Sequence, residues 1–187
     1  MDAPTATVAD PAEVLQFWTE AGPKRWFRKD AAFDAGFRER FLPSHEAAAH
    51  GALASWTAAG DSCLALLVLL DQFPRNAFRD TARAWSTDAL ARVVAQQALA
   101  RGFDLQVASD ALRNFFYLPF MHSEWLPDQE RCLVLTRGFD GNDQARFAQV
   151  HHDIIRRFGR FPHRNALLGR RTTRDEQAFL DAGGFGG

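Results

Sequence analysis

Apolar residues recur three or four positions apart along most of this chain, and this spacing limits the possible folds more than any other feature. Phe33, Phe37 and Phe41 follow one another at intervals of four, which places three aromatic rings on one face of a helix. A second helical face combines Phe147, Val150, His151, Ile154 and Phe158. The pattern predicts an all-α protein.

The stretch Cys63–Gln72 is apolar on all sides, so periodicity alone does not separate a buried helix from a buried strand. We predict a helix, because the stretch is rich in leucine and alanine and no other segment reads convincingly as a strand with which it could pair.

Capping residues, prolines and glycines mark where helices begin and end. Asp10, a proline and Glu13 predict the start of a first helix, and Thr173 with Glu176 fits a capping box that opens a last one. Pro43 is expected to interrupt the helix, so that a new segment begins there. Further helices are expected at residues 63–72, 87–101, 127–137 and 142–158, with another that ends near Pro119.

Seven to nine helices with short connections favour antiparallel neighbours, so the predicted architecture is an array of helical hairpins or an irregular bundle. No linker divides the sequence. We therefore expect one domain over residues 1–187, with frayed tails at residues 1–9 and 183–187.

Composition argues against several classes of protein. The formal net charge of −1 gives no overall reason to expect binding to nucleic acid or to an anionic membrane. The longest apolar run, Cys63–Leu70, is shorter than the roughly 20 residues that cross a bilayer, and residues 1–9 do not resemble a secretory signal. We expect a soluble, cytoplasmic protein whose Cys63 and Cys132 are reduced core thiols, with no metal and no cofactor.

Between Ile154 and Thr173 the chain carries six arginines and one histidine but no acidic residue. Such a stretch could attract phosphate or RNA. Arginine outnumbers lysine 20 to 2 in the whole chain, however, so a solvated face or a network of ion pairs is favoured and nucleic-acid binding is not expected.

One motif occurs twice, as Phe73-Pro74-Arg75-Asn76 and as Phe161-Pro162-His163-Arg164-Asn165. Proline ends or kinks a helix and frees carbonyl groups, to which a following arginine or asparagine can donate. This structural interpretation is sufficient for both copies. In the functional alternative the two corners converge and present Arg75, Asn76, Arg164 and Asn165 to one anionic ligand.

A third corner follows Leu118-Pro119 and carries His122 and Glu124, which are candidates for acid–base catalysis. The alternative is that Glu124 pairs with a nearby arginine. His151 lies on the apolar face of its helix, where a histidine is usually a hydrogen-bonded core residue. His152 and Asp153 beside it do not indicate a metal site, because adjacent helical positions point about 100° apart.

These corners resemble a bacterial family known as domain of unknown function 924. The resemblance rests on the stretches 69–76, 118–124, 151–155, 158–165 and 168–170, and extends from Val14 to Leu180. It implies an all-α fold similar to the tetratricopeptide-like superhelices. It implies no activity.

The main hypothesis is that the three proline corners form a pocket for a small anion bearing a phosphate or a carboxylate. In this hypothesis His122 and Glu124 would act as acid or base if the protein is an enzyme, which the sequence does not decide. The ligand-binding candidates are Asp71, Arg75, Asn76, His151, Arg160, Arg164 and Asn165. The alternative is a tetratricopeptide-like module that binds a peptide or a protein partner without catalysis.

Overall fold

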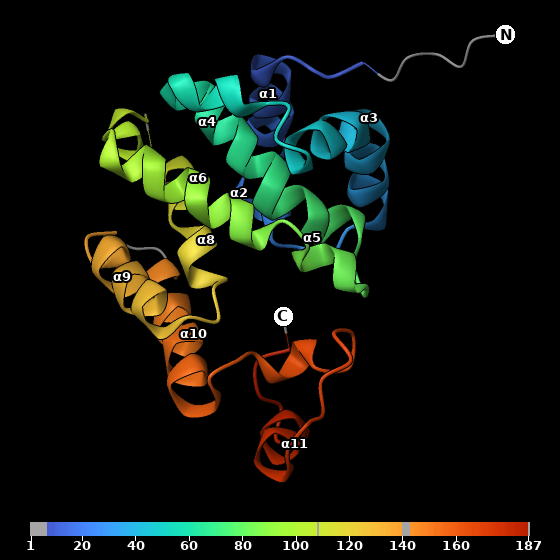
Figure 1. Ribbon diagram of the computed structural model, residues 1–187, viewed down its shortest axis with the longest axis vertical. Helices are drawn as coiled ribbons and strands as arrows, with labels where there is room; N and C mark the ends of the chain where they lie inside the picture. The colour runs from blue at the N-terminus through green and yellow to red at the C-terminus, as the bar shows by residue number, and fades with distance from the viewer. Residues whose placement is uncertain (1–6, 108, 140–142, 187) are drawn as a thin grey trace, which may run out of the picture. The chain divides into compact units, whose positions relative to one another are not determined.

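The computed structural model describes residues 7–107, 109–139 and 143–186, and within these ranges it contains helices but no strand (Figure 1). The predicted all-α class is confirmed. Parts of both expected tails, residues 1–6 and 187, lie outside the described residues, as does Asn142, the predicted first residue of a helix.

The α-helices are α1 (Pro11–Ala21), α2 (Pro23–Trp26), α3 (Ala31–Ala49), α4 (Gly60–Leu67), α5 (Phe73–Ala77), α6 (Asp88–Ala100), α7 (Asp110–Arg113), α8 (Leu118–Met121), α9 (Leu126–Thr136), α10 (Gln144–Phe158) and α11 (Arg174–Asp181). The π-helical segment is η2 (Val68–Gln72), and the 3-10 segments are η1 (Ala54–Ala58), η3 (Ala82–Trp85), η4 (Phe103–Gln106), η5 (Asn114–Phe116) and η6 (Pro162–Arg164). Within the described ranges, α1, α3, α4, α6, α9, α10 and α11 have eight residues or more.

The chain forms two compact units, which we call unit 1 (residues 1–79 and 83–116) and unit 2 (residues 80–82 and 117–187). In unit 1, α1 packs against α4, and α3 packs against α5. In unit 2, α9 and α10 pack side by side (Figure 1), and α11 packs against η6. The single domain expected from the sequence stays a prediction.

Both predicted helix starts are present, and each has a capping box. The Asp10 carboxylate accepts a hydrogen bond from the Ala12 N–H at the start of α1, and the Glu13 side chain accepts one from the Asp10 N–H. The Thr173 hydroxyl and Glu176 form the same arrangement at α11. The caps satisfy N–H groups that have no partner inside the helix, so sequence alone located these two starts.

The structure corrects the prediction at Pro43. Helix α3 continues through this proline to Ala49 and does not restart there. A proline inside a helix costs about 3 kcal/mol, but the residues on both sides of it, Phe41, Ser44 and His45, are buried in unit 1. Burial of this helical face outweighs the local penalty.

The helix expected to end near Pro119 is also different. The segment η5 ends at Phe116, and Pro119 lies in the first turn of α8. Proline is well tolerated there, because the first N–H groups of a helix have no partner inside it.

The stretch Cys63–Gln72 is helical, as predicted, but Pro74 does not end it. The helix widens into η2 and continues as α5 to Ala77. The carbonyl oxygens of η2 find side-chain donors: Leu69 O contacts His45 Nδ1 at 2.9 Å, Leu70 O accepts from the Thr87 hydroxyl, and Asp71 O accepts from Arg75 at 2.6 Å. The expectation that the arginine after proline donates to a freed carbonyl is confirmed in this copy of the motif.

Each unit buries apolar and aromatic side chains of its own. In unit 1 the rings of Phe33, Phe37 and Phe41 lie in series on one face of α3, as their spacing predicts: Phe33 and Phe37 are stacked at 5.8 Å between centroids, and Phe37 and Phe41 meet edge to face at 5.7 Å. In unit 2 one cluster of buried residues consists of Ile154, Ile155 and Phe161, with Leu126, Phe158, Phe179 and Phe185 packed around it. Cys63 and Cys132 are buried free thiols, and burial raises their pKa values to about 11 and about 12. Among the described helices, none combines the length and the apolar character needed to cross a membrane.

Candidate functional site

The third predicted corner is held by one buried side chain. The Gln129 amide on α9 donates to the carbonyl oxygens of Met121 at 2.7 Å and Ser123 at 2.6 Å, with a longer contact to Phe120 at 3.3 Å. Gln129 is fully buried. The turn after α8 is therefore fixed from inside unit 2, which sets the positions of His122 and Glu124.

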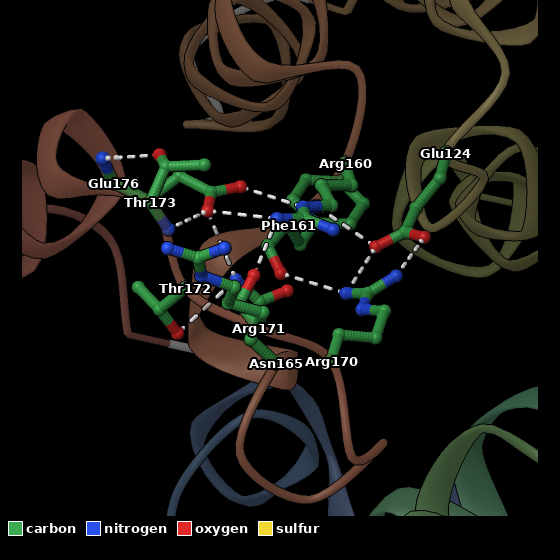
Figure 2. Close-up of polar contacts among 9 residues, drawn as sticks. All are labelled: Glu124, Arg160, Phe161, Asn165, Arg170, Arg171, Thr172, Thr173 and Glu176. Carbon is green, nitrogen blue, oxygen red and sulfur yellow. Dashed lines mark hydrogen bonds and ion pairs between the residues drawn. The ribbon is translucent and has the colours of Figure 1, made fainter.

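Glu124 joins this turn to the second copy of the Phe-Pro motif (Figure 2). Its carboxylate accepts two hydrogen bonds from the Arg170 guanidinium, at 2.6 and 3.0 Å, and a third from the Phe161 N–H at 2.8 Å. Arg170 also donates to the Phe161 carbonyl oxygen at 3.1 Å. The expectation that Glu124 pairs with an arginine is confirmed.

The protonation of Glu124 follows from these contacts. Partial burial acts to raise its pKa, but the hydrogen bonds from Arg170 and from the Phe161 N–H outweigh burial and hold the pKa below the usual value. Glu124 is thus an ionised group whose oxygens already accept hydrogen bonds, which is poorly suited to a general acid.

Arg160 and Glu176 form a second bidentate pair, at 2.6 and 2.9 Å (Figure 2). Glu176 also accepts from the Thr173 N–H at 2.7 Å and lies 3.3 Å from the Asn165 amide. The hydrogen bonds from Arg160 are the main cause that lowers the pKa of Glu176 to about 2. These contacts connect α11 to the chain around η6.

Three imidazoles and a guanidinium gather beside these pairs, and we call His122, His151, His163 and Arg164 the histidine cluster. The rings of His122 and His151 lie 6.4 Å apart between centroids. The Arg164 guanidinium lies 4.5 Å over the Phe161 ring and donates to the His122 carbonyl oxygen at 3.1 Å. The two corners of unit 2 therefore meet, as the main hypothesis requires of them.

Phe185, near the C-terminus, completes the surroundings of this cluster. Its ring lies 4.5 Å from the His151 ring and 5.4 Å from the His163 ring, between centroids. The Phe161 ring contacts the same two histidines, at 5.4 and 5.7 Å. The imidazoles are thus packed between aromatic rings and are partly shielded from water.

Burial is the main cause that lowers the pKa of His151 to about 3, and electrostatic interactions with His122, Arg164 and His163 lower it further. His151 is therefore neutral at physiological pH. Among the described residues, no group of three or more histidine, cysteine, aspartate or glutamate side chains is arranged to hold a metal ion.

Comparison with known proteins shows to which family the chain belongs. The model of a family described as bacterial protein of unknown function (DUF924) matches residues 14–184. The chain belongs to this family. The resemblance inferred from the sequence motifs is thereby confirmed.

A solved protein of unknown function from Agrobacterium tumefaciens is 49% identical to this DUF924 protein. The match covers 92% of this chain and 97% of that chain, with a TM-score of 0.89. No curated protein matches the chain.

The first Phe-Pro corner of the DUF924 protein belongs to unit 1, where its polar groups meet acidic side chains. Arg75 contacts Asp88 in a bidentate pair at 2.9 and 3.0 Å and Asp71 at 3.2 Å. The Asn76 amide donates to Asp34 at 2.8 Å. These contacts fit the structural interpretation of the motif. The meeting of this corner with the other two stays a prediction.

Sequence reasoning missed some groups that build the site in unit 2. Glu176 was visible only as a helix cap, and Arg170 only as one of several arginines. No sequence pattern singled out Gln129 or Phe185. Pairing partners so far apart in the chain follow from the tertiary fold and not from local periodicity.

The arginine-rich stretch does not form a surface of one sign. Arg160 and Arg170 pair with glutamates, and Arg156 lies 3.5 Å from Asp153. Arg157 stacks over Phe158 at 4.6 Å. These contacts agree with the network of ion pairs that the sequence favoured over a phosphate-binding face.

A shallow apolar groove of about 270 Å³ lies between α10, α11 and the C-terminal segment of unit 2. It is lined by Val150, Asp153, Ile154, Arg157, Phe158, Phe179 and Phe185. Val150 is 38% exposed at this groove. We call this surface the α10–α11 groove.

Proposed function

We propose that unit 2 binds a small anion, bearing a carboxylate or a phosphate, at the histidine cluster. The observation that carries the proposal is the meeting of the two corners of unit 2, where the rings of His122 and His151 lie 6.4 Å apart between centroids and the Arg164 guanidinium donates to the His122 carbonyl oxygen at 3.1 Å. The permanent charge of the Arg164 guanidinium makes the local potential positive, and a positive potential attracts an anion.

The chemistry of the cluster fits such a ligand. Guanidinium and imidazole N–H groups are donors that recognise the oxygens of carboxylates and phosphates, and the guanidinium is a planar fork that matches two such oxygens. Arg164 is only 7% exposed. Charge-assisted hydrogen bonds are stronger in such surroundings than in water, because the local dielectric constant is lower.

In this proposal the other predicted residues of unit 2 have a structural role. Glu124 and Arg160 are engaged in bidentate pairs that hold the chain around Phe161, and Asn165 lies against Glu176. They position the cluster and do not contact the anion. The proposal assigns binding and no reaction.

Titration with inorganic phosphate tests the proposal. Side-chain ¹⁵N signals of His122, His151 and His163 should shift together and saturate, whereas those of the exposed His50 in unit 1 should not. His163→Gln should weaken phosphate binding by about threefold or more, the effect of one hydrogen bond, and His50→Gln should leave it unchanged. Equal, unsaturated shifts at His50 and at the cluster would show general ionic screening and would refute the site.

A second candidate function rests on the α10–α11 groove. Here the partner would be an amphipathic helix of another protein, with apolar residues against Val150 and Phe179 and charges opposite Asp153 and Arg157. A displayed library of amphipathic helices is the direct test. Selected peptides should bind the wild type and Val134→Asp, which changes an exposed valine of α9, but not Val150→Asp. Equal binding by both variants would exclude the groove.

A further inference from the structure

We infer that the partner helix of the α10–α11 groove carries an acidic residue beside its apolar anchor, and that Arg157 binds this carboxylate. The inference rests on the second candidate function, to which it adds the charge that the partner must present. It is independent of the histidine cluster.

The groove has a wall that is fixed in place. The Gly184 N–H donates to the Phe179 carbonyl oxygen at 2.9 Å, so the C-terminal segment lies directly against α11. A side chain at position 184 would not fit there, because a Cβ atom would lie 2.5 Å from the Phe179 ring. This contact holds the neighbouring Phe185 in the lining of the groove. The apolar surface is therefore formed before a partner arrives, which lowers the cost of binding.

The size of the groove favours a side chain of a larger partner over a free small molecule. Its volume of about 270 Å³ is below the range of roughly 300–1,000 Å³ that is typical of small-molecule pockets, and the groove is shallow. A free ligand would remain largely exposed to water. A helix can instead place one apolar side chain against Val150 and Phe179 and contact the rim with its neighbouring residues.

Among the described residues that line the groove, Arg157 is the basic one. Its Cζ atom lies 4.6 Å from the centroid of the Phe158 ring and 6.0 Å from that of Phe179. Within the part of the chain that the structure describes, its guanidinium forms no ion pair and no hydrogen bond. A guanidinium stacked on rings keeps its charge and presents the N–H groups at its edge, which can donate to a carboxylate.

The acidic residue of the lining, Asp153, lies one turn before Arg157 but pairs with other groups. One of its oxygens accepts from the Gln149 amide at 3.0 Å and lies 3.2 Å from His152 Nδ1 and 3.5 Å from the Arg156 guanidinium. Arg156 thus offsets the charge of Asp153, whereas the charge of Arg157 has no counter-ion among the described residues. The groove is therefore complementary to an acidic partner more than to a basic one.

A displayed library of amphipathic helices tests the inference on the full-length protein. Each member has a leucine-rich face, and the positions that flank this face carry glutamate, glutamine or lysine in equal proportions. The relevant binders are those that no longer bind to Val150→Asp. They should contain glutamate about two- to fivefold more often than glutamine, the effect of a solvent-exposed ion pair, and lysine less often than glutamine.

Charge-reversal variants assign the preference to Arg157. In Arg157→Glu the preference should invert, so that lysine exceeds glutamine, and in Arg157→Gln it should disappear. The control is Arg137→Glu, which reverses an exposed arginine at the end of α9 in the same unit and should keep the preference for glutamate. Thermal unfolding confirms that each variant is folded, and the comparison on the wild type stands by itself if one is not.

The possible outcomes distinguish failure of the inference from failure of the function on which it rests. Binding that depends on Val150 but shows no preference for glutamate, or a preference for lysine, would overturn the inference and leave the groove as a binding surface. A preference for glutamate that survives in Arg157→Glu would refute the role of Arg157. Absence of any binder that depends on Val150 would overturn the second candidate function itself.

Discussion

The pair between Glu124 and Arg170 supports a quantitative prediction about unit 2. Glu124→Gln keeps the size of the side chain and removes its charge. In the wild type, the Phe161 N–H lies 2.8 Å from Oε1 of Glu124, and an Arg170 donor lies 2.6 Å from Oε2. In the variant, the amide oxygen can still accept from the Phe161 N–H, but the new NH₂ group would face the Arg170 donor. One arm of the bidentate pair is replaced by a contact between two donors.

The size of the effect follows from burial and from the type of bond. Hydrogen bonds to charged groups contribute about 1.5–3 kcal/mol. The side chains of Glu124 and Arg170 are 27% and 23% exposed, so solvent screens the pair only in part. We expect the substitution to lower the local stability around Phe161 by about 2 kcal/mol, which is about 30-fold in an equilibrium constant.

Hydrogen exchange at the Phe161 amide measures this stability directly, because its N–H donates to Glu124. Exchange in Glu124→Gln should be about 30-fold faster than in the wild type. The control is Glu130→Gln, an exposed position of α9 in the same unit, which should change exchange less than about threefold. A similar small change in both variants would show that the pair contributes nothing to the stability of this corner.

Three further predictions follow. The pKa of Glu176 is lowered to about 2, so the contribution of its carboxylate to stability is complete above the ordinary pKa of 4.5 and is lost as the pH falls toward 2. In Glu176→Gln the free energy of unfolding, measured by urea titration, should therefore depend less on pH across that range. Phe185→Ala exposes His151 to water, so the pKa of His151 should rise from about 3, as followed by ¹⁵N titration, and an unchanged pKa would contradict the role of burial. Thr87→Val removes the buried donor to Leu70 O and should lower the free energy of unfolding by about 1–2 kcal/mol, whereas Thr57→Val removes a solvent-exposed hydrogen bond to Ala54 O and should change it by less than about 0.5 kcal/mol in the same urea titration.

Features governed by local chemistry could be predicted from the sequence. The capping boxes at Asp10 and Thr173 and the row of phenylalanine rings on α3 depend on residues within one or two helical turns. The same local rules were wrong at Pro43, because the cost of an internal proline is fixed by the helix whereas the gain from burying Phe41 and His45 is set by tertiary packing.

The kinds of contact in the candidate site could be predicted from the sequence, but the residues that pair with each other could not. A proline that frees carbonyl groups needs donors, and Arg75 supplies one as expected. That Glu124 would meet an arginine also followed from its charge. The partner, Arg170, lies 46 residues away, and nothing in the local sequence distinguishes it from the five other arginines of its stretch.

The ion pairs and the proposed anion site depend on each other through the backbone at Phe161. Glu124 binds the Phe161 N–H while Arg170 binds both Glu124 and the Phe161 carbonyl oxygen, so this one residue is held on both sides. The Arg164 guanidinium rests on the Phe161 ring, and the same ring packs against His151. Glu124, considered from sequence as a catalytic acid, is therefore better explained as the group that fixes the distance between guanidinium and imidazole. A binding site that needs a guanidinium and an imidazole at set positions requires such a support, because its side chains must be held close to the geometry that binds the ligand.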